Sequence, residues 1–219
     1  MKKLIKKINE IDFDSLECII VNNGSTDNSS SIISKNIATR NSLFKLVNIK
    51  KNIGYGHGIM EGVKKSSGEI IAWTHADLQT DPNDVIDAYF SFHKNTKCVL
   101  KGKRVGRNFF DELFTFGMSI LASRLMKVKL SDINAQPKMF HHNFVKKLEN
   151  APDDFSLDLF FLYQAKINGY NIIEYPVYFN KRKYGQSKGG GSLKGKIKLI
   201  MRTWTYMLDL SRKTSSVWK

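Results

Sequence analysis

The stretch WTHADLQTDP contains three polar side chains whose spacing could support chemistry. His75, Asp77 and Gln79 alternate along one segment, and alternate residues of an extended chain point to the same side. Nitrogen and oxygen donors that converge in this way can bind a divalent cation. The alternative is a polar turn that only begins the next helix, since Asp81 is a good capping residue and Pro82 is favoured at the first helical position.

These side chains need a strand before them and a helix after them, and the surrounding pattern predicts both. Apolar, β-branched runs predict buried strands at residues 17–22, 43–49, 69–74 and 97–102. Helical patterns lie between them, from a cap at Asp27 or Asn28 to about residue 39, over 57–65, and from Asp81 onward. The alternation predicts an α/β fold with a parallel sheet, in which ligands bind at the carboxyl ends of strands. The stretches VNNGSTD and WTHADLQ both lie at such ends.

The second half of the chain has a different pattern. It predicts an apolar helix over 108–128, a loop over 132–140 that leads into a short strand, and an apolar helix over 155–169. The strand that follows contains Pro176, which favours a sheet edge or a bulge. The Gly-rich stretch KYGQSKGGGSLKG then precedes an amphipathic helix over 193–210.

The composition is that of a globular protein with a large excess of basic residues. The formal net charge is +15, and residues 181–219 contain eleven Lys or Arg against one acid. Such a segment favours an anionic partner: a membrane surface, a nucleic acid or a phosphorylated substrate. Cys18 and Cys98 lie in apolar runs and are expected to be reduced, and MKKLIKKINEI lacks the apolar core of a secretory signal. No apolar run approaches the ~18 residues that span a bilayer, so we expect a cytoplasmic protein.

Four stretches, in this order and at these separations, resemble the family 2 glycosyltransferases of the GT-A fold: CIIVNNGSTDNS, NIGYGHGIMEGVKKSSGEIIAWTHADLQTDP, DINAQPKMF and EYPVYFNKRKYGQSK. Within this family the chain is most similar to the dolichyl- or polyprenyl-phosphate sugar transferases. The resemblance identifies residues 1–190 as the glycosyltransferase domain and leaves 191–219 as a basic amphipathic helix and tail. It implies a Rossmann-like, mainly parallel sheet sandwiched by helices. The implied activity is inverting, metal-assisted transfer of a hexose from a nucleotide-sugar to a polyprenyl phosphate or similar acceptor.

The metal site is implied by the family's Asp-x-Asp motif. A divalent cation, Mn²⁺ or Mg²⁺, neutralises the charge that builds up on the departing diphosphate. The residues that match the motif are His75, Asp77 and Gln79, so the resemblance implies that they bind the metal and that Asp77 also contacts the donor. His75 replaces the first acid of the motif and removes one negative charge from the site.

The stretch NNGSTD matches a family loop near the base and ribose of the nucleotide. The resemblance implies donor contacts from Asn22, Asn23 and Asp27, with a helix cap as the simpler interpretation of Asp27. An amide oxygen can accept from the N3–H of uracil but suits the paired donors of guanine less well, so UDP is favoured over GDP. Gly54 and Gly58 would allow close approach to the donor, or would only form a tight turn.

The acceptor side depends on cations. Arg104, Arg182 and Lys188 match family residues near the acceptor phosphate, with a solvated basic surface as the alternative. A phosphate acceptor needs no general base, whereas a hydroxyl acceptor needs a carboxylate. Asp158, in the apolar stretch FSLDLFF, is the candidate for that base or for an acceptor contact. The other candidates are Asp132 and Asp154.

The helix over 193–210 suits an anionic membrane interface, because its basic flanks accompany Trp204 and Tyr206, although it could also pack on the domain. We therefore expect a peripheral protein on the inner face of the cell membrane. A nucleic-acid partner is not expected, because no recognition motif accompanies the charge.

The chain also departs from the family pattern. The family's first strand and its Pro-x-Tyr-Asn-Glu loop have no counterpart, and MKKLIKKINEI matches the helix after them, so the chain is expected to be N-terminally incomplete. Together with His75, Asn22 and Asn23, this leaves a catalytically weak or inactive nucleotide-sugar-binding protein as an alternative.

Overall fold

The computed structural model describes residues 2–10, 16–38, 43–92, 97–107, 109–180, 201 and 203–210. Its strands are β1 (Cys18–Asn23), β2 (Phe44–Ile49), β3 (Ile70–Trp73), β4 (Cys98–Val105), β5 (Lys138–His141) and β6 (Asn171–Tyr178). Its helices are α1 (Lys2–Asn9), α2 (Ser29–Ile37), α3 (Tyr55–Lys65), α4 (Asn83–Ser91), α5 (Phe109–Met126) and α6 (Leu157–Ile167), with a 3₁₀ helix η2 (His142–Leu148). Residues 203–210 are also helical. The predicted elements within these ranges are present with ends shifted by a few residues, whereas η2 was not predicted.

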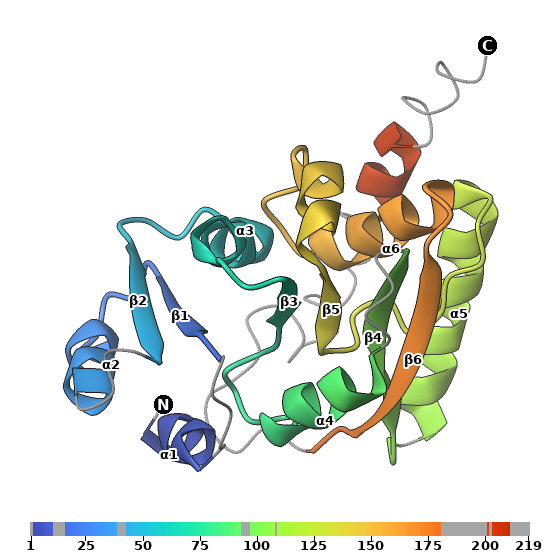
Figure 1. Ribbon diagram of the computed structural model, residues 1–219. Coiled ribbons are helices and arrows are strands. Elements are labelled where there is room, and N and C mark those ends of the chain that lie inside the picture. The colour runs from blue at the N-terminus through green and yellow to red at the C-terminus, as the bar shows by residue number, and fades with distance from the viewer. Residues whose placement is uncertain are drawn as a thin grey trace.

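The described strands form two sheets (Figure 1). In the first, β1 and β2 are parallel, with Cys18 opposite Phe44. The second has the order β3-β5-β4-β6, in which β4 and β6 are parallel and β5 is antiparallel to β3 and β4. Three of its four strands therefore point the same way, which confirms a mixed α/β fold with a mainly parallel sheet. We expected a single sheet. The described strands form two sheets instead, because β1 and β3 are neither paired with each other nor joined by a described strand between them.

Side chains of the four-stranded sheet alternate between two helical layers, as the pleat of a strand requires. Val99 and Phe140 pack into the cluster that contains residues of α3 and α6. Leu100 follows Val99 on β4, and Met139 precedes Phe140 on β5. Both pack against α4. Figure 1 shows α3 and α6 on one side of the strands and α4 on the other. The sheet is therefore sandwiched by helices.

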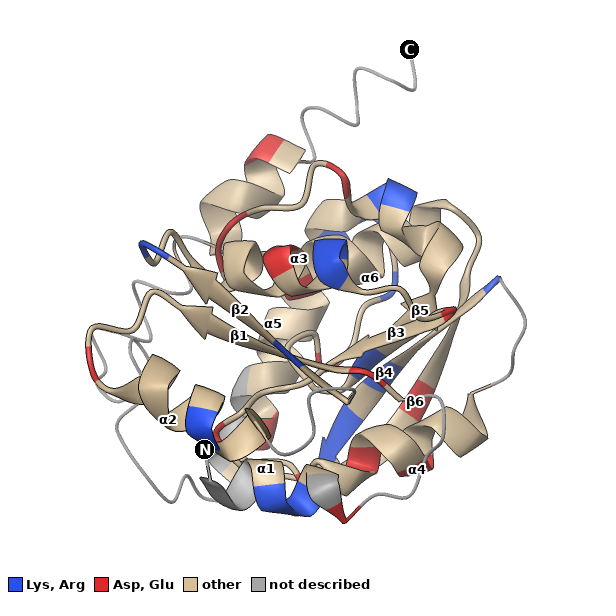
Figure 2. Ribbon diagram, turned by 60° about the vertical axis from the view of Figure 1, so that its left-hand side comes forward, with Lys and Arg blue, Asp and Glu red and all other residues tan. Residues whose placement is uncertain are grey.

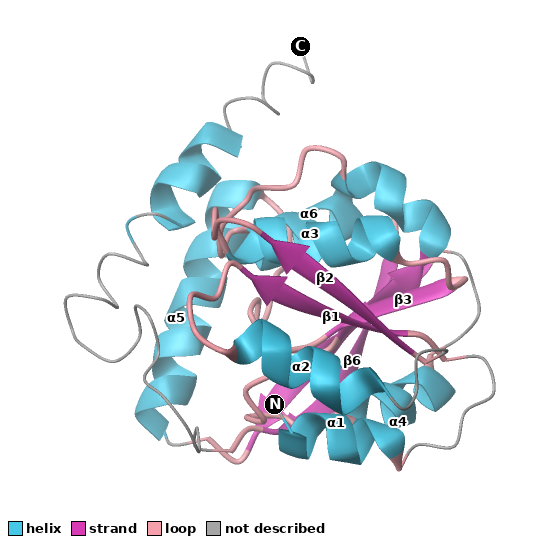
Figure 3. Ribbon diagram, turned by 90° about the vertical axis from the view of Figure 1, so that its left-hand side faces the viewer, coloured by secondary structure: helices cyan, strands magenta, loops and turns pink. Residues whose placement is uncertain are grey.

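A smaller core lies under the first sheet. Ile5 of α1 and Ile33 of α2 pack with Ile20 and Phe44 of the strands. Figure 3 shows α1 and α2 in front of this sheet and α3 above it. The β1–β2 pair is therefore a packed layer in its own right and holds the carboxyl end of β1 beside the start of α3.

The end of β3 is fixed by aromatic packing. Trp73, the last residue of β3, meets Phe161 of α6 edge to face, with ring centroids 5.1 Å apart, and Phe140 of β5 at 5.4 Å. Edge-to-face pairs stabilise by about 0.5–1.5 kcal/mol beyond area burial. The loop that carries His75 therefore leaves the sheet from an anchored position.

Two further expectations concern cysteines and membrane spans. Cys18 and Cys98 are both free thiols, as expected, and burial raises the pKa of Cys18 to about 12. Across the part of the chain that the structure describes, no helix is long and apolar enough to cross a membrane.

Candidate active site

His75, Asp77 and Gln79 lie in the loop after β3, and each of them is half-buried. Asp77 Oδ1 accepts from the backbone N–H of Gln79 at 3.1 Å, and Gln79 Nε2 donates to the carbonyl of Asn180 at 3.4 Å. Leu78 between them has a φ of 59°, a left-handed conformation that a non-glycine residue rarely adopts. Such strain persists where the surrounding structure imposes it, and it is typical of functional loops.

The same loop also begins α4. Asp81 was predicted to cap this helix with Pro82 as its first residue, but α4 begins at Asn83 and Pro82 is at its N-cap. Asp81 lies just before the cap, and its Oδ1 accepts from the backbone N–H of Asn83 at 3.1 Å. Asp81 also forms an ion pair with Lys7 of α1. The loop is therefore a helix start and a polar site at once.

Tyr55, the first residue of α3, connects His75 to the interior. Its hydroxyl lies 3.1 Å from His75 Nε2, and the two rings meet edge to face. The same hydroxyl lies 3.2 Å from Asp158 Oδ2 and 3.1 Å from Gln136 Nε2. Burial, followed by the charge of Asp158, raises the pKa of Tyr55 well above its ordinary value. The hydroxyl is therefore protonated at neutral pH.

Asp158 is the anchor of this network. It is 2% exposed, and Nζ of the fully buried Lys138 lies 3.3 Å from its Oδ1. Gln136 Nε2 donates to the same oxygen at 2.9 Å. Burial lowers the pKa of Lys138, and the charge of Asp158 opposes this shift. The predicted role of Asp158 as a base or acceptor contact stays a prediction, and its burial and partners favour a structural role.

The two amides at the end of β1 have different surroundings. Asn22 donates to Asn48 Oδ1 at 3.0 Å and accepts from the backbone N–H of Ser25 at 3.2 Å, so both ends of its amide hold the loop. Asn23 donates to the carbonyl of Gly54 at 2.9 Å, and its buried Oδ1 has no hydrogen-bond partner within the described residues. Asn23 is therefore better placed than Asn22 to accept a hydrogen bond from a donor.

The other residues predicted for the donor side have structural partners. Asp27 accepts from the backbone N–H of Ser29 at 3.0 Å, and the hydrogen bonds of Ser29 lower the pKa of Asp27. Asn28 is at the N-cap of α2, with no capping bond from its side chain, and Asp27 bonds to the first helical residue from the position before the cap. A Cβ on Gly54 would lie 2.1 Å from the carbonyl oxygen of Asp153, and one on Gly58 would lie 2.7 Å from Asn23 Nδ2. Both glycines allow close packing within the protein, and donor contact stays a prediction.

Arg104 on β4 is held by Asp132. Its backbone N–H donates to Asp132 Oδ2 at 2.7 Å, its Nε donates to Oδ1 at 2.8 Å, and Nη2 also contacts Oδ1. Burial raises the pKa of Asp132, but the bonds and charge of Arg104 outweigh it and lower the pKa on balance. The basic residues of β4 are visible in Figure 2. Arg182 and Lys188 lie outside the described residues.

An exposed apolar surface follows α5. Its residues are Phe109, Leu113, Phe116 and Ile120, which are 71%, 54%, 64% and 43% exposed. Their spacing of four, three and four residues places them on one side of the helix. We call these four residues the α5 surface.

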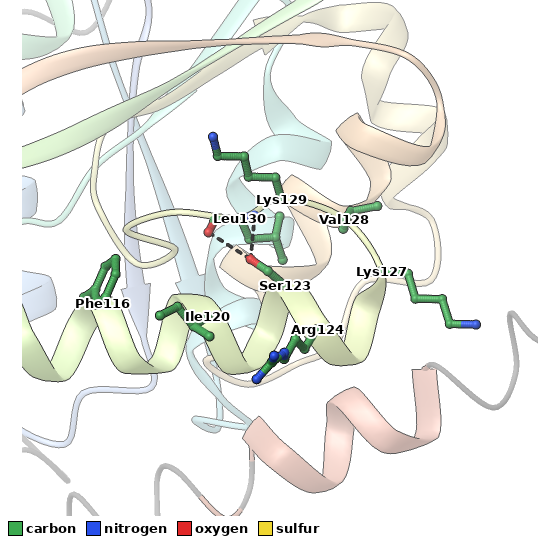
Figure 4. Close-up of a pocket in the computed structure, with 8 residues that line it drawn as sticks. All are labelled: Phe116, Ile120, Ser123, Arg124, Lys127, Val128, Lys129 and Leu130. Atoms are coloured by element: carbon green, nitrogen blue, oxygen red, sulfur yellow. Dashed lines mark hydrogen bonds between the residues drawn. The ribbon is translucent and has the colours of Figure 1, made fainter.

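The α5 surface ends at an open groove with basic residues around it (Figure 4). The groove has a volume of about 470 Å³, and Ser123 near its centre bonds to both backbone groups of Leu130. Its exposed cations are Arg124, Lys127 and Lys129. The surface thus combines apolar side chains with positive charge, which suits an anionic partner that also has an apolar layer.

Sequence reasoning missed Tyr55, Gln136 and Lys138. The signal that could have been used is Lys138 itself, a lysine that stands beside apolar residues in a predicted strand. A charge in a buried strand needs a partner, so such a lysine predicts a buried polar network. Lys101 shows the same pattern: it is 1% exposed, and its Nζ lies 2.9 Å from Glu174 Oε1. Tyr55 and Gln136 had no such signal, because their partners are distant in sequence.

The donor set after β3 is small for a metal cage. Within the described ranges no three His, Cys, Asp or Glu side chains surround one position. His75, Asp77 and the Gln79 amide offer one nitrogen and two kinds of oxygen donor. Such a set fits a cation that takes its other ligands from phosphate oxygens and water, as Mg²⁺ and Mn²⁺ commonly do.

Comparison with known proteins adds independent information. The family model described as "Glycosyl transferase family 2" matches residues 1–143. A dodecaprenyl-phosphate galacturonate synthase of Rhizobium johnstonii is 25% identical over 197 residues, which are 89% of this chain and 55% of that relative. The chain therefore spans about half the length of this curated relative.

Two solved structures have a similar fold. A mannosyltransferase from Pyrobaculum calidifontis, in complex with GDP-Man and Mn²⁺, gives a TM-score of 0.61 at 17% identity, covering 99% of this chain and 71% of that one. Glucosyl-3-phosphoglycerate synthase from Mycobacterium tuberculosis, in complex with Mn²⁺, UDP-glucose and phosphoglyceric acid, gives 0.69 at 13% identity, covering 96% and 74%. At these identities the likeness concerns the fold.

Proposed function

This chain belongs to glycosyl transferase family 2, and from that premise we propose that it transfers a hexose from a nucleotide-sugar to a polyprenyl phosphate with inversion. The observation that carries the proposal is the loop after β3, which joins Asp77 and His75 to the polar network of Tyr55. The similarity to dodecaprenyl-phosphate galacturonate synthase supports the choice of acceptor class.

The donor would bind across the carboxyl ends of β1 and β3. A divalent cation bound by Asp77, His75 and the Gln79 amide would act as a Lewis acid on the diphosphate. Asn23 Oδ1 has an unused acceptor position within the described structure and suits the N3–H of uracil. UDP is therefore the proposed nucleotide, although similar folds are known in complexes with both GDP-Man and UDP-glucose.

The state of the carboxylates favours a phosphate acceptor over a hydroxyl. Asp158 is buried beneath Tyr55, Asp132 is paired with Arg104, and Asp154 Oδ1 accepts from the backbone N–H of Ser156 at 2.8 Å. None of these three predicted candidates is arranged as a solvent-facing general base. A phosphate oxygen is already anionic and needs no base, so this arrangement suits a lipid phosphate.

The proposed location is peripheral, on the cytoplasmic face of a membrane. The α5 surface presents four exposed apolar side chains with basic residues at one end. Aromatic and apolar side chains enter the interface of a bilayer, while cations attract anionic lipids. A protein on this surface would meet a lipid-linked acceptor where it resides.

A nucleotide-sugar-binding protein without turnover is the second candidate. The observation that favours it is His75, which stands where the family's motif has an acid and leaves Asp77 as the one carboxylate among the three loop residues. A neutral ligand attracts a divalent cation less strongly than an acid does, so the metal that would stabilise the leaving diphosphate would be bound more weakly.

The test is transfer by the full chain with Mn²⁺ and UDP-hexoses, comparing polyprenyl phosphate with the matched polyprenol. We expect lipid-linked sugar and released UDP with the phosphate only, and a fall of about 100-fold in Asp77→Asn. The matched control is Asp87→Asn, an exposed acid on α4, which should keep full activity. Transfer to the polyprenol at an equal rate would contradict the acceptor assignment, and UDP binding without turnover would support the second candidate.

A further inference from the structure

We propose that Asp132 is a positioning residue, which holds Arg104 so that the Nη1–Nη2 edge of its guanidinium is left for the phosphate of a prenyl phosphate acceptor. The acceptor class rests on the proposed function, whereas the orientation of Arg104 follows from contacts within this chain. Asp132 is a candidate base by sequence, and in this role it would instead act on the acceptor through Arg104.

Asp132 holds the backbone of Arg104 at the point where the pairing of β4 with β5 ends. The N–H of Gly102 still donates to the carbonyl of Pro137, just before β5, at 2.8 Å. Residues two apart on a strand direct their N–H groups to the same side, so the N–H of Arg104 follows on this edge. Its acceptor is Asp132 Oδ2 at 2.7 Å. The carboxylate therefore continues the hydrogen-bond ladder beyond the last strand pair.

The second oxygen of Asp132 holds the side chain of Arg104. Oδ1 accepts from Nε at 2.8 Å and also contacts Nη2. Burial raises the pKa of Asp132, but the bonds and charge of Arg104 lower it on balance, so the carboxylate is ionised at neutral pH. The Nε–Nη2 edge of the guanidinium is therefore occupied by a carboxylate.

Phe179 lies against one face of the same guanidinium. The Cζ atom of Arg104 is 5.5 Å from the centre of the Phe179 ring, which is within the range of a cation–π contact. The N–H of Phe179 donates to the carbonyl of Val105 at 3.4 Å, so the ring is held beside the end of β4. The ring and the Asp132 carboxylate thus restrict the guanidinium from two directions.

The remaining donors of Arg104 form one edge. A guanidinium has five N–H groups, and Asp132 accepts from one on Nε and one on Nη2. Both N–H groups of Nη1 and the second one of Nη2 have no hydrogen-bond partner among the described residues. Two terminal nitrogens of this kind bind two phosphate oxygens in parallel. The side chain is 13% exposed, so part of it is accessible to a ligand.

The two residues after β6 connect Arg104 to the loop proposed for the donor. Phe179 contacts Arg104, and the next residue, Asn180, donates its backbone N–H to the carbonyl of Gln79 at 2.8 Å. Gln79 Nε2 donates back to the carbonyl of Asn180 at 3.4 Å. A phosphate at Arg104 would therefore lie at the same end of the sheet as the diphosphate of the donor, as transfer between them requires.

Asp132 has two opposing effects on an anion at Arg104. Its charge offsets part of the attraction of Arg104, so its removal would tighten binding if charge decided the affinity. Its hydrogen bonds hold the guanidinium in one orientation, so their removal would weaken binding if orientation decided it. We expect orientation to dominate, because bidentate binding needs both nitrogens in place, whereas solvent screens a partly exposed charge. The sign of the change in affinity distinguishes the two effects.

Calorimetric titration of farnesyl phosphate into the metal-free full chain, without donor, measures this site. We expect binding that falls about tenfold in Asp132→Ala, the equivalent of one hydrogen bond to a charged group. Arg104→Lys keeps the charge but lacks the two parallel donors, so a similar fall is expected. The matched control is Glu149→Ala, which removes the same charge at an exposed position and should leave binding unchanged. Farnesol, which lacks the phosphate, should not bind at this site.

A double variant separates positioning from a general structural role. If Asp132 acts through Arg104, adding Asp132→Ala to Arg104→Ala should cause no further loss of affinity. Independent losses that multiply in the double variant would overturn the positioning role. In transfer assays, Asp132→Ala should raise the KM for the lipid phosphate about tenfold and leave the KM for the UDP-hexose unchanged. A cooperative unfolding transition would establish that each variant folds, and Arg104→Lys provides the test where Asp132→Ala does not fold.

Equal or tighter binding of farnesyl phosphate by Asp132→Ala would overturn the proposal, as would equal binding of farnesol by the unaltered chain. The expected losses of binding without any sugar transfer would support the role of Asp132 and count against the proposed function alone. Sugar transfer to polyprenyl phosphate with an unchanged acceptor KM in Asp132→Ala would support the proposed function and overturn the role of Asp132.

Discussion

Lys138 and Asp158 form an ion pair inside the protein, with Nζ 3.3 Å from Oδ1 and side chains that are 0% and 3% exposed. Removing one partner would leave a buried charge without compensation. We expect Asp158→Asn to lower the free energy of unfolding by about 3–5 kcal/mol, as measured by urea denaturation. In the double variant Asp158→Asn/Lys138→Met much of this loss should be recovered, because no charge is then left buried.

The control for this pair is Glu61→Gln on the surface of α3. Lys64 Nζ lies 2.7 Å from Glu61 Oε1, but the pair is solvated, so the expected loss is at most about 0.5 kcal/mol. Equal losses in Asp158→Asn and Glu61→Gln would contradict the importance of the buried pair.

Glu174 makes stability depend on pH in the acid range. Burial raises its pKa, but Ser131 at 2.7 Å, Lys101 at 2.9 Å and Lys103 at 3.1 Å outweigh this and lower the pKa from 4.5 to about 2. A lowered carboxylate pKa stabilises the folded state above the unfolded pKa, and this contribution is lost as pH falls from 4.5 toward 2.

We therefore expect Glu174→Gln to make unfolding by acid less steep in this range, as followed by circular dichroism at each pH. Glu112→Gln, at an exposed position of α5, is the control and should keep the original pH dependence. A Glu174→Gln protein with the same acid transition as the unaltered chain would show that the three partners do not hold the carboxylate.

Gly54 tests how closely α3 approaches the 152–154 segment. A Cβ there would lie 2.1 Å from the carbonyl oxygen of Asp153, so Gly54→Ala should destabilise the protein by about 1–3 kcal/mol. Gly117→Ala is the matched control, because among the described residues no atom beyond its neighbours and its own helix backbone lies within 4 Å of a Cβ at this position. That variant should stabilise by about 0.5–1 kcal/mol. Thermal unfolding of both proteins measures the difference, and a neutral Gly54→Ala would refute the close contact.

The α5 surface predicts binding to anionic membranes. Phe116→Ser should weaken binding to vesicles that contain phosphatidylglycerol by about tenfold, because an apolar side chain no longer enters the interface. The control is Phe90→Ser, since Phe90 is 72% exposed on α4, away from the α5 surface. Cosedimentation with vesicles measures both. Equal effects of Phe116→Ser and Phe90→Ser on vesicle binding would argue against membrane binding by the α5 surface. Dimerisation of the chain through α5 would argue against it as well.

The fold could be predicted well because each element has a local signal. The alternation of apolar and helical runs indicated the α/β class, and Asp81 before Pro82 indicated the start of α4. The reversed direction of β5 and the division into two sheets could not be predicted, because strand pairing depends on contacts between distant residues. Val99 pairs with Phe140, for example, 41 positions along the chain.

The site could be predicted only in part. Strand-end position indicated His75, Asp77 and Asn23, whose surroundings support a polar site. The sequence suggested Asp158 as a base because an acid in an apolar helix is unusual, but its buried partner Lys138 lies 20 positions away on another element. Spacing along a helix carries no information about such a partner, so the anchoring role became visible only in the fold.

The most direct test of the central claim is calorimetric titration of UDP into the full chain with Mn²⁺. We expect saturable binding that requires Mn²⁺, that falls by about 100-fold in Asp77→Asn, and that is retained in Asp87→Asn. Binding that is equal with and without Mn²⁺ and equal in all three proteins would contradict a metal-assisted nucleotide-sugar site at the loop after β3.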